Sequence, residues 1–304
     1  MRFQMEIDEY LKRIEVEQPK NGATKEYLNQ LHIGHLTHIP FETFDLIDLK
    51  QLNISIDHVF ERIVRQNRGG VCYQMNGLFA YILGKLGYHV QYVPCGVYML
   101  DKKIYHSIHS HVSLCITLEN DEKMLCDVGF SRDYLTPLYF RTDCVQFALD
   151  GFFRLIKSED GKFYHLERGF LETNQSISLP SPSTRSTHIV DIDPEKIKWV
   201  GSYRFPINFD ELNLKLEDFE SACSSTLHSP DVRLNHLTIC RIEVFEPFIG
   251  ARGIIGKTYS EWTLENGIET RTDMQLSDDN QDELKKILKE KFHLDIDRTI
   301  HLVE

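Results

Sequence analysis

The chain has 304 residues, and its 46 acidic side chains outnumber the 34 basic ones, which gives a formal charge of −12. With 41% hydrophobic and 26% charged residues, this length predicts a globular protein of two or three domains with a large buried core. No long basic block occurs, and no apolar run approaches the roughly 18 residues of a membrane span. The sequence therefore argues against nucleic acid and against a membrane as partners.

The cysteine pattern and the N-terminus indicate the compartment. The first ten residues are charged and mixed, without the apolar stretch of a secretory signal peptide. Seven cysteines stand at irregular spacings, and none forms a Cys-x-x-Cys pair. We expect free thiols in a cytoplasmic protein. His106, His109 and His111 lack a carboxylate or thiol that would complete a tight site, so we expect no metal.

Helical periodicity dominates the first 88 residues. Thr24 can cap one helix of this region, and Asp57 can cap another. A further apolar helix follows Cys72 and is expected to end at Gly87, because glycine is common just past a helix C-terminus.

From residue 89 the apolar pattern changes to that of strands, which are rich in Val, Ile, Tyr and Leu. Short strands separated by polar turns predict a small antiparallel barrel or sandwich. The expected strands cover 89–98, 110–118, 124–128, 145–147, 152–156 and 163–166.

The remaining chain mixes both patterns. Residues 171–190 are rich in Ser, Thr and Pro and predict an exposed connection. Residues 210–223 are expected to form a helix, and a closing helix is expected over 282–292. Strands are expected at 237–246 and 257–264.

Residues 68–77 read Arg-Gly-Gly-Val-Cys-Tyr-Gln-Met-Asn-Gly and place Cys72 just after a Gly-Gly turn, at the start of a helix. This position suits a nucleophile, because the helix N-terminus favours the thiolate and should lower the thiol pKa. A free cysteine is more often a small buried hydrophobe, so the position needs support from other residues.

His111 and Asp127 provide that support, because a cysteine nucleophile needs a base and a group that orients it. Asp127 stands in an apolar strand, where an unpaired carboxylate would cost free energy. If Leu118 faces Met124 across the polar turn, His111 and Asp127 lie on the same face of the sheet.

Several motifs resemble those of the arylamine N-acetyltransferases, in the same order along the chain. The resemblance covers about residues 28–296. The motifs are Arg68-Gly69-Gly70-Val71-Cys72-Tyr73-Gln74-Met75-Asn76, Pro40-Phe41-Glu42-Thr43-Phe44, Asp127-Val128-Gly129-Phe130-Ser131, and the later Tyr203-Arg204-Phe205, Asp218-Phe219-Glu220 and Ser229-Pro230.

The resemblance implies an α+β fold with a cysteine-protease-like core. It implies a helical domain over 1–88 that carries the nucleophile, an antiparallel β-barrel domain over 89–200 and an α/β lid domain over 201–304. It also implies the catalytic triad Cys72, His111 and Asp127.

The implied reaction moves an acetyl group from acetyl-CoA to an arylamine, a hydrazine or an arylhydroxylamine through an acetyl-Cys72 intermediate. Phe41, Phe130 and Ser110 are expected at the amine substrate, where the aromatic side chains would form an apolar slot. Backbone N–H groups of Gly129 and Ser131, with Ser107 as a further residue, are expected to hold the coenzyme.

Other activities use the same three residues. A cysteine hydrolase, a transglutaminase-like enzyme and an amide synthase acting on a carrier-bound thioester remain alternatives, as does a binding protein without catalysis. The sequence departs from the family at Ile108 and Asp231, two positions that the resemblance places near the coenzyme. Ile108 is bulkier than the usual residue, and an aspartate beside a phosphate is unfavourable.

Overall fold

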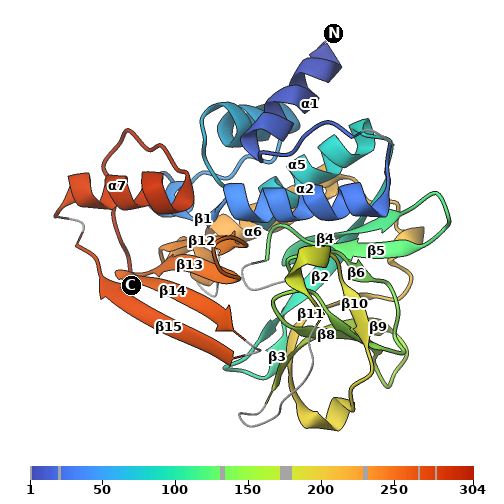
Figure 1. The fold of residues 1–304 in the computed structure, drawn as a ribbon. Coiled ribbons are helices and arrows are strands. Elements are labelled where there is room, and N and C mark those ends of the chain that lie inside the picture. Colours follow the sequence, from blue (N-terminus) through green and yellow to red (C-terminus); the bar gives the residue numbers. More distant parts are fainter. Residues whose placement is uncertain are drawn as a thin grey trace.

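Three lobes make up the protein, seen in a computed structural model that describes residues 2–19, 22–130, 134–171, 180–228, 232–265, 268–277 and 279–304. The helical lobe contains α1 to α5, the barrel lobe contains β2 to β11, and the C-terminal lobe contains β12 to β15 with α7. In Figure 1 the helical lobe lies above the barrel lobe, and the C-terminal lobe lies beside both.

The helical lobe begins and ends its helices largely where the sequence predicts. The helices are α1 (Arg2–Arg13), α2 (Lys25–His38), α3 (Phe44–Asp48), α4 (Ile56–Phe60) and α5 (Cys72–Lys85). The Thr24 hydroxyl accepts a hydrogen bond from the Tyr27 N–H at 3.2 Å, which confirms the predicted cap. Gly87 follows α5 with φ of +93°, as predicted. The cap predicted at Asp57 is wrong, because α4 already includes that residue and Ser55 precedes it.

The barrel lobe is one curled antiparallel sheet in the order β10-β7-β8-β9-β11-β2-β4-β5-β6, with β3 paired to β2. Its strands are β2 (His89–Met99), β3 (Ile104–Tyr105), β4 (His111–Thr117), β5 (Lys123–Cys126), β6 (Leu138–Tyr139), β7 (Val145–Phe147), β8 (Phe152–Lys157), β9 (Phe163–Leu171), β10 (His188–Val190) and β11 (Ile197–Pro206). All six predicted strands are present. Because β11 pairs with both β9 and β2, a domain boundary drawn after residue 200 would divide a strand of this sheet.

The C-terminal lobe holds a second antiparallel sheet in the order β1-β12-β13-β14-β15. Its elements are β12 (Ile239–Val244), β13 (Gly250–Ile255), β14 (Thr258–Glu265), β15 (Ile268–Gln275) and α7 (Gln281–Phe292), and its edge strand β1 (Phe41–Glu42) comes from the helical part of the chain. The helix predicted over 210–223 is wrong in its first half. Asn213 has a left-handed φ of +47° there, so the helix α6 starts only at Glu220 and runs to His228.

A shared core fixes the helical lobe on the barrel. Leu78 and Phe79 of α5 belong to the same buried cluster as Leu114 and Ile116 of β4. Each such side chain stabilises the contact by about 1.5–3 kcal/mol when fully buried. The N-terminus of α5 is therefore held beside the start of β4. In the part of the chain that the structure describes, every helix is too short or too polar to span a bilayer.

Candidate active site

The turn before α5 depends on two glycines that allow close backbone approach. A Cβ atom at Gly69 would lie 2.0 Å from the Pro40 carbonyl oxygen, so any other residue would clash there. The Gly70 N–H donates to the Pro40 carbonyl at 3.3 Å, and the Gly70 carbonyl accepts from the Glu42 N–H at 3.0 Å. The Arg-Gly-Gly motif and the Pro-Phe-Glu motif, 28 positions apart, thus form one unit of structure.

A group of ion pairs anchors this turn to the rest of the protein, and we call it the arginine–carboxylate cluster. It consists of Arg62, Arg68 and Arg298 with Glu42, Asp45 and Asp48. Glu42 accepts hydrogen bonds from Arg62 at 2.5 Å and from Arg68 at 2.7 Å, whereas Asp45 contacts all three arginines. Burial alone would raise the pKa of Asp45, but the charges of Arg62 and Arg68 outweigh burial and hold this pKa well below its usual range.

The cysteine sits at the first position of α5 with only 4% of its surface exposed. Gln74 closes the helix start, because its side-chain oxygen accepts from the Val71 N–H at 3.2 Å. The Gln74 amide nitrogen donates to the Asn53 carbonyl at 2.9 Å. Gln74 thereby connects the nucleophile turn to the loop that precedes α4.

His111, the first residue of β4, donates from Nε2 to Asp127 Oδ2 at 2.6 Å. In the register of β4 and β5, Met124 pairs with Ile116 and not with Leu118, the partner expected from the sequence. A shift of two residues keeps the same faces of the sheet, so His111 and Asp127 lie on a common face as predicted. The other ring nitrogen, Nδ1, has no hydrogen-bond partner in the described part of the chain. It is therefore the nitrogen available to take a proton from a thiol.

Three donors hold the fully buried Asp127 carboxylate. Besides His111, the Asn76 amide donates to Oδ1 at 2.8 Å and the Gly129 N–H donates to Oδ1 at 3.0 Å. Asn76 also donates to the Val112 carbonyl at 2.7 Å and accepts from the Val128 N–H at 3.0 Å. Asn76 stands four residues after Cys72, on the same face of α5, and so links the nucleophile helix to both strands of the pair.

Sequence reasoning missed a second positioning residue, His32 of α2. Its Nε2 accepts from the backbone N–H of Asp127 at 3.2 Å, and its Nδ1 donates to the Leu135 carbonyl at 3.0 Å. Burial lowers the pKa of His32 to about 4, so the ring is neutral at physiological pH. Nothing near His32 in the sequence indicates this contact, since Asp127 follows 95 positions later.

Cys72 lies against the start of β4 and the Asp127 loop. A Cβ atom at Gly129 would lie 2.6 Å from the Cys72 Cα, and the Val112 backbone N–H lies within reach of the thiol. Burial raises the pKa of the Cys72 thiol, and Cys223 and Asp127 raise it further, while the N–H groups of Tyr73 and Val112 lower it. The lowered pKa predicted from the helix terminus is therefore wrong. Desolvation wins, so the thiolate can form only together with proton transfer to a base.

The structure places the three residues predicted at the amine substrate, Phe130, Phe41 and Ser110, in different surroundings. The Phe130 ring centroid lies 5.1 Å from that of His111, edge to face, and 5.4 Å from that of Tyr203. Phe41 is buried in the main core and bridges to Gly70 beside the nucleophile turn. Ser110 instead accepts from the Val97 N–H at 3.2 Å and fixes the end of the preceding loop.

The predicted coenzyme residues are also placed. Ser107 lies in the loop between β3 and β4, exposed, with its hydroxyl 3.0 Å from His106 Nδ1. The Gly129 N–H was predicted to bind the pyrophosphate of the coenzyme. It donates instead to the Asp127 carboxylate, because the chain turns back over this carboxylate after the strand. Ser131 lies outside the described residues, as does Asp231. Among the described residues, histidine, cysteine and acidic side chains form no group of three that could hold a metal.

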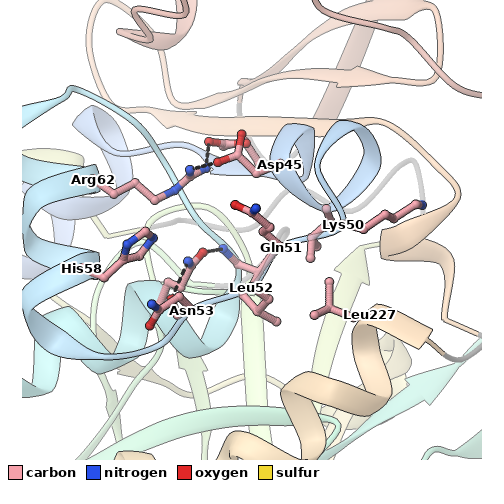
Figure 2. A pocket seen from close by; sticks show the side chains of 12 residues that line it. Asp45, Lys50, Gln51, Leu52, Asn53, His58, Arg62 and Leu227 are labelled. Atoms are coloured by element: carbon pink, nitrogen blue, oxygen red, sulfur yellow. Dashed lines mark hydrogen bonds and ion pairs between the residues drawn. The ribbon is translucent and has the colours of Figure 1, made fainter.

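A cavity of about 380 Å³ is lined in part by Val71 and Gln74 of the nucleophile turn, and Figure 2 shows Asp45, Asn53 and Arg62 around it. Its walls include Asp45 and Arg62 of the arginine–carboxylate cluster, together with Gln51, Asn53 and Gln74. Cys72, His111 and Asp127 do not line it. The cavity therefore borders the nucleophile turn at Val71 without including any of these three residues.

A helical lobe that contributes a cysteine, joined to a β-barrel that contributes a histidine and a carboxylate, defines a class of proteins with a cysteine-protease-like core. A model of the N-acetyltransferase family matches residues 24–301, most of the chain. The protein belongs to this family, which confirms the resemblance found in the motifs.

Relatives cover nearly the whole length. An arylamine N-acetyltransferase of Gallus gallus, a pineal gland isozyme, is 24% identical over 305 residues, covering 97% of this chain and 96% of that protein. The solved structure of the arylamine N-acetyltransferase from Salmonella typhimurium matches 96% of this chain and 93% of its own, with a TM-score of 0.75 and 21% identity. The Mycobacterium marinum enzyme in complex with CoA matches 95% of this chain and 92% of its own, with a TM-score of 0.74 and 20% identity. These likenesses confirm the predicted fold class.

Proposed function

We propose that this protein transfers an acetyl group from acetyl-CoA to the nitrogen of an arylamine or hydrazine, or to the oxygen of an arylhydroxylamine, with Cys72 as the nucleophile. The observation that carries the proposal is the His111–Asp127 contact of 2.6 Å beside the N-terminus of the Cys72 helix. The family membership, and the printed names of the relatives, supply the reaction and the acceptor class.

In the first half-reaction His111 Nδ1 takes the proton of the Cys72 thiol while the sulfur attacks the thioester carbonyl. The carbon–sulfur bond to coenzyme A breaks, and the imidazolium returns its proton to the departing thiolate of coenzyme A. Asp127 keeps the imidazole in the tautomer that leaves Nδ1 free and stabilises the imidazolium that forms. The first half-reaction exchanges one thioester for another and is near balance, and the second converts the acyl-enzyme thioester into a more stable amide or ester.

In the second half-reaction the amine attacks the acetyl-Cys72 carbonyl. His111 accepts a proton from the nitrogen and gives a proton to the departing sulfur, which regenerates the thiol. The edge of the Phe130 ring against His111 supports an aromatic acceptor, because an aryl ring could stack at this position. The 4% exposure of Cys72 supports transfer over hydrolysis, since water must be kept from the acyl-enzyme. Seven free cysteines support a reducing compartment such as the cytoplasm.

The test is intact-mass measurement after mixing with acetyl-CoA alone. We expect the mass of one acetyl group to be gained, and to be lost when an aromatic amine is added. Steady-state plots over both substrates should be parallel, because coenzyme A leaves before the amine reacts.

Cys72→Ala should gain no acetyl group, whereas Cys144→Ala, which removes a half-buried thiol between β6 and β7, should behave as the wild type. Loss of the acetyl group in buffer as fast as with amine would instead assign a hydrolase. Acylation of Cys72→Ala would disprove the nucleophile.

A further inference from the structure

One face of the barrel sheet carries polar and aromatic side chains that make no hydrogen bonds to one another or to the rest of the described chain. We call this group the Arg204 cluster, and it consists of Tyr98, Tyr105, Phe163, His165 and Arg204. The strand register builds it, since Arg204 of β11 pairs with His165 of β9, and Tyr98 of β2 pairs with Tyr105 of β3. Their ring centroids lie 5.0 Å apart for the two tyrosines and 4.7 Å apart for Tyr105 and His165.

Arg204 is a positioned cation that forms no ion pair within 4.0 Å among the described residues. Asp160, whose pKa is lowered mainly by a hydrogen bond from a neighbouring hydroxyl, nevertheless lies close enough for the Arg204 charge to lower this pKa further. Its guanidinium carbon lies 4.4 Å from the Phe163 ring centroid and 5.1 Å from the Tyr105 ring centroid. The Arg204 Nε atom and the His165 Nε2 atom are buried, and neither has a hydrogen-bond partner among the described residues. Buried donors of this kind cost free energy unless a partner completes them, so the cluster is organised for a group that comes from outside.

The nearest acidic side chains are engaged elsewhere. Glu167 forms an ion pair with Arg154 at 2.7 Å, and Asp160 accepts from the Ser158 hydroxyl at 2.6 Å and lies near Lys162. Neither carboxylate contacts Arg204 within the described chain. Burial and the charge of Arg204 lower the pKa of His165, so this ring is neutral and Arg204 supplies the positive charge.

The cluster lies one strand away from His111 in the sheet but on the opposite face, because Tyr203, which precedes Arg204 in β11, has its ring centroid 5.3 Å from that of His111. Cys95 and Gly96 are consecutive in β2, and Cys95 pairs with His111 on one side while Gly96 pairs with Arg204 on the other. A Cβ atom at Gly96 would lie 2.5 Å from the His106 carbonyl oxygen, so the glycine lets the loop between β3 and β4 lie on the sheet beside Arg204. The same loop reaches the nucleophile, because the His109 carbonyl accepts from the Tyr73 hydroxyl at 2.7 Å.

A guanidinium flanked by tyrosines is suited to a nucleotide, because the guanidinium binds phosphate and the rings can stack on a base. We propose that Arg204 binds a phosphate of the acyl donor's nucleotide and that the surrounding rings form its platform. This inference rests on the proposed function, since acetyl-CoA joins such a nucleotide to the reacting thioester through a long flexible arm. Arg204 acts on donor affinity and takes no part in the chemistry at Cys72.

The experiment compares two acyl donors on Arg204→Met, in which the methionine keeps an apolar chain between Tyr105 and Phe163. The donors are acetyl-CoA and S-acetyl-N-acetylcysteamine, which has the thioester but no nucleotide. We expect the apparent second-order rate constant for Cys72 acylation by acetyl-CoA to fall about tenfold or more, through a higher KM, as for the loss of one charged hydrogen bond. The rate constant with the truncated donor should not change.

Arg154→Met is the matched control, because Arg154 stacks on Trp199 at 4.3 Å in the same sheet but already has Glu167 as its anion. It should leave both rate constants at the wild-type value. Arg204→Lys should recover part of the acetyl-CoA rate, since the charge is kept and the planar fork is lost.

Unchanged acylation of Arg204→Met by acetyl-CoA would overturn the assignment while the proposed function stands. Equal losses with both donors would overturn it too, because they would mean a structural role. If the wild type is acylated by the truncated donor but not by acetyl-CoA, the proposed function fails and the role of Arg204 fails with it.

Discussion

The two sides of the nucleophile turn hold their carboxylates in opposite ways. On one side Asp127 is buried with a single ionisable partner, His111, and its remaining donors are the neutral Asn76 amide and the Gly129 N–H. On the other side Asp45 meets three guanidinium groups of the arginine–carboxylate cluster. Only a backbone of a few residues, from Arg68 to Cys72, separates the two.

The two sides differ in whether their groups can change protonation during a reaction. Fully charged pairs with several arginines hold a turn firmly, but they leave no group that can change its protonation during a reaction. Neutral donors fix the Asp127 carboxylate and leave the imidazole of His111 as the one partner that can gain and lose a proton. We therefore infer that the arginine side positions the turn and that the neutral side performs the proposed chemistry.

The largest expected effect comes from replacing Asp127, the carboxylate that we propose orients His111. In Asp127→Asn the amide nitrogen would face His111 Nε2 and force the proton onto Nδ1, so we expect acylation to slow by about 10⁴-fold. Rapid-mixing measurement of acetyl-enzyme formation would test this. Asp45→Asn is the comparison variant, and its folded protein should acylate at the wild-type rate. A slow Asp45→Asn with a normal Asp127→Asn would reverse the roles assigned to the two sides.

The second effect is on stability. Arg68→Met removes one of the guanidinium groups that contact Glu42 and Asp45, while Arg62 still pairs with both, so we expect a loss of about 1.5–3 kcal/mol in the free energy of unfolding. Urea unfolding measures this value. Arg65→Met is the matched control, since Arg65 is exposed and pairs with Glu9 and Glu61 at the surface, and it should not change stability measurably. Equal losses for both variants would contradict the comparison.

Acid should weaken the two sides in different pH windows. His32 has its pKa lowered to about 4, so the unfolded chain binds a proton below about pH 6.5 while the folded protein does not. Stability on the triad side is therefore complete above about pH 6.5 and falls by about 3 kcal/mol towards pH 4. The pKa of Asp45 is lowered, so its contribution persists in this window and is lost only below about pH 4.

Urea unfolding across this pH range, with His32→Gln, sharpens the test. Glutamine can still accept from the Asp127 N–H but does not titrate, so the slope of stability against pH should decrease by up to one proton. His35 on the same helix also has its pKa lowered by burial, and its share of the slope should remain. An unchanged slope in His32→Gln would show that His32 does not carry the effect.

The smallest expected effect lies between the two sides. Gln74→Glu keeps an acceptor for the Val71 N–H but replaces the donor to the Asn53 carbonyl with a second oxygen. We expect a loss of about 1–2 kcal/mol in stability, with acylation by acetyl-CoA within about threefold of wild type. Thermal unfolding and the acylation rate measure the two quantities. A large loss of rate without a loss of stability would mean that the sides are coupled through Gln74.

The sequence alone determined the fold class, the helices of the first 88 residues and most strands of the barrel, and it led to the prediction of Cys72, His111 and Asp127 as a triad. Periodicity shows these elements because a buried face imposes a spacing of 3.6 or 2 residues on the chain. The Thr24 cap and the end of α5 at Gly87 were predictable for a similar reason, since both depend on backbone groups within a few residues.

Only the tertiary structure decided how those residues behave. The thiol pKa of Cys72 was predicted in the wrong direction, because burial depends on what the lobes place around the helix end and not on the local motif. The partners of Asp127 come from α2, α5 and β4, which no local pattern relates. The arginine–carboxylate cluster likewise joins Asp45 to Arg298, 253 positions away. Desolvation and long-range hydrogen bonds are properties of packing, and packing is fixed only when the whole chain is folded.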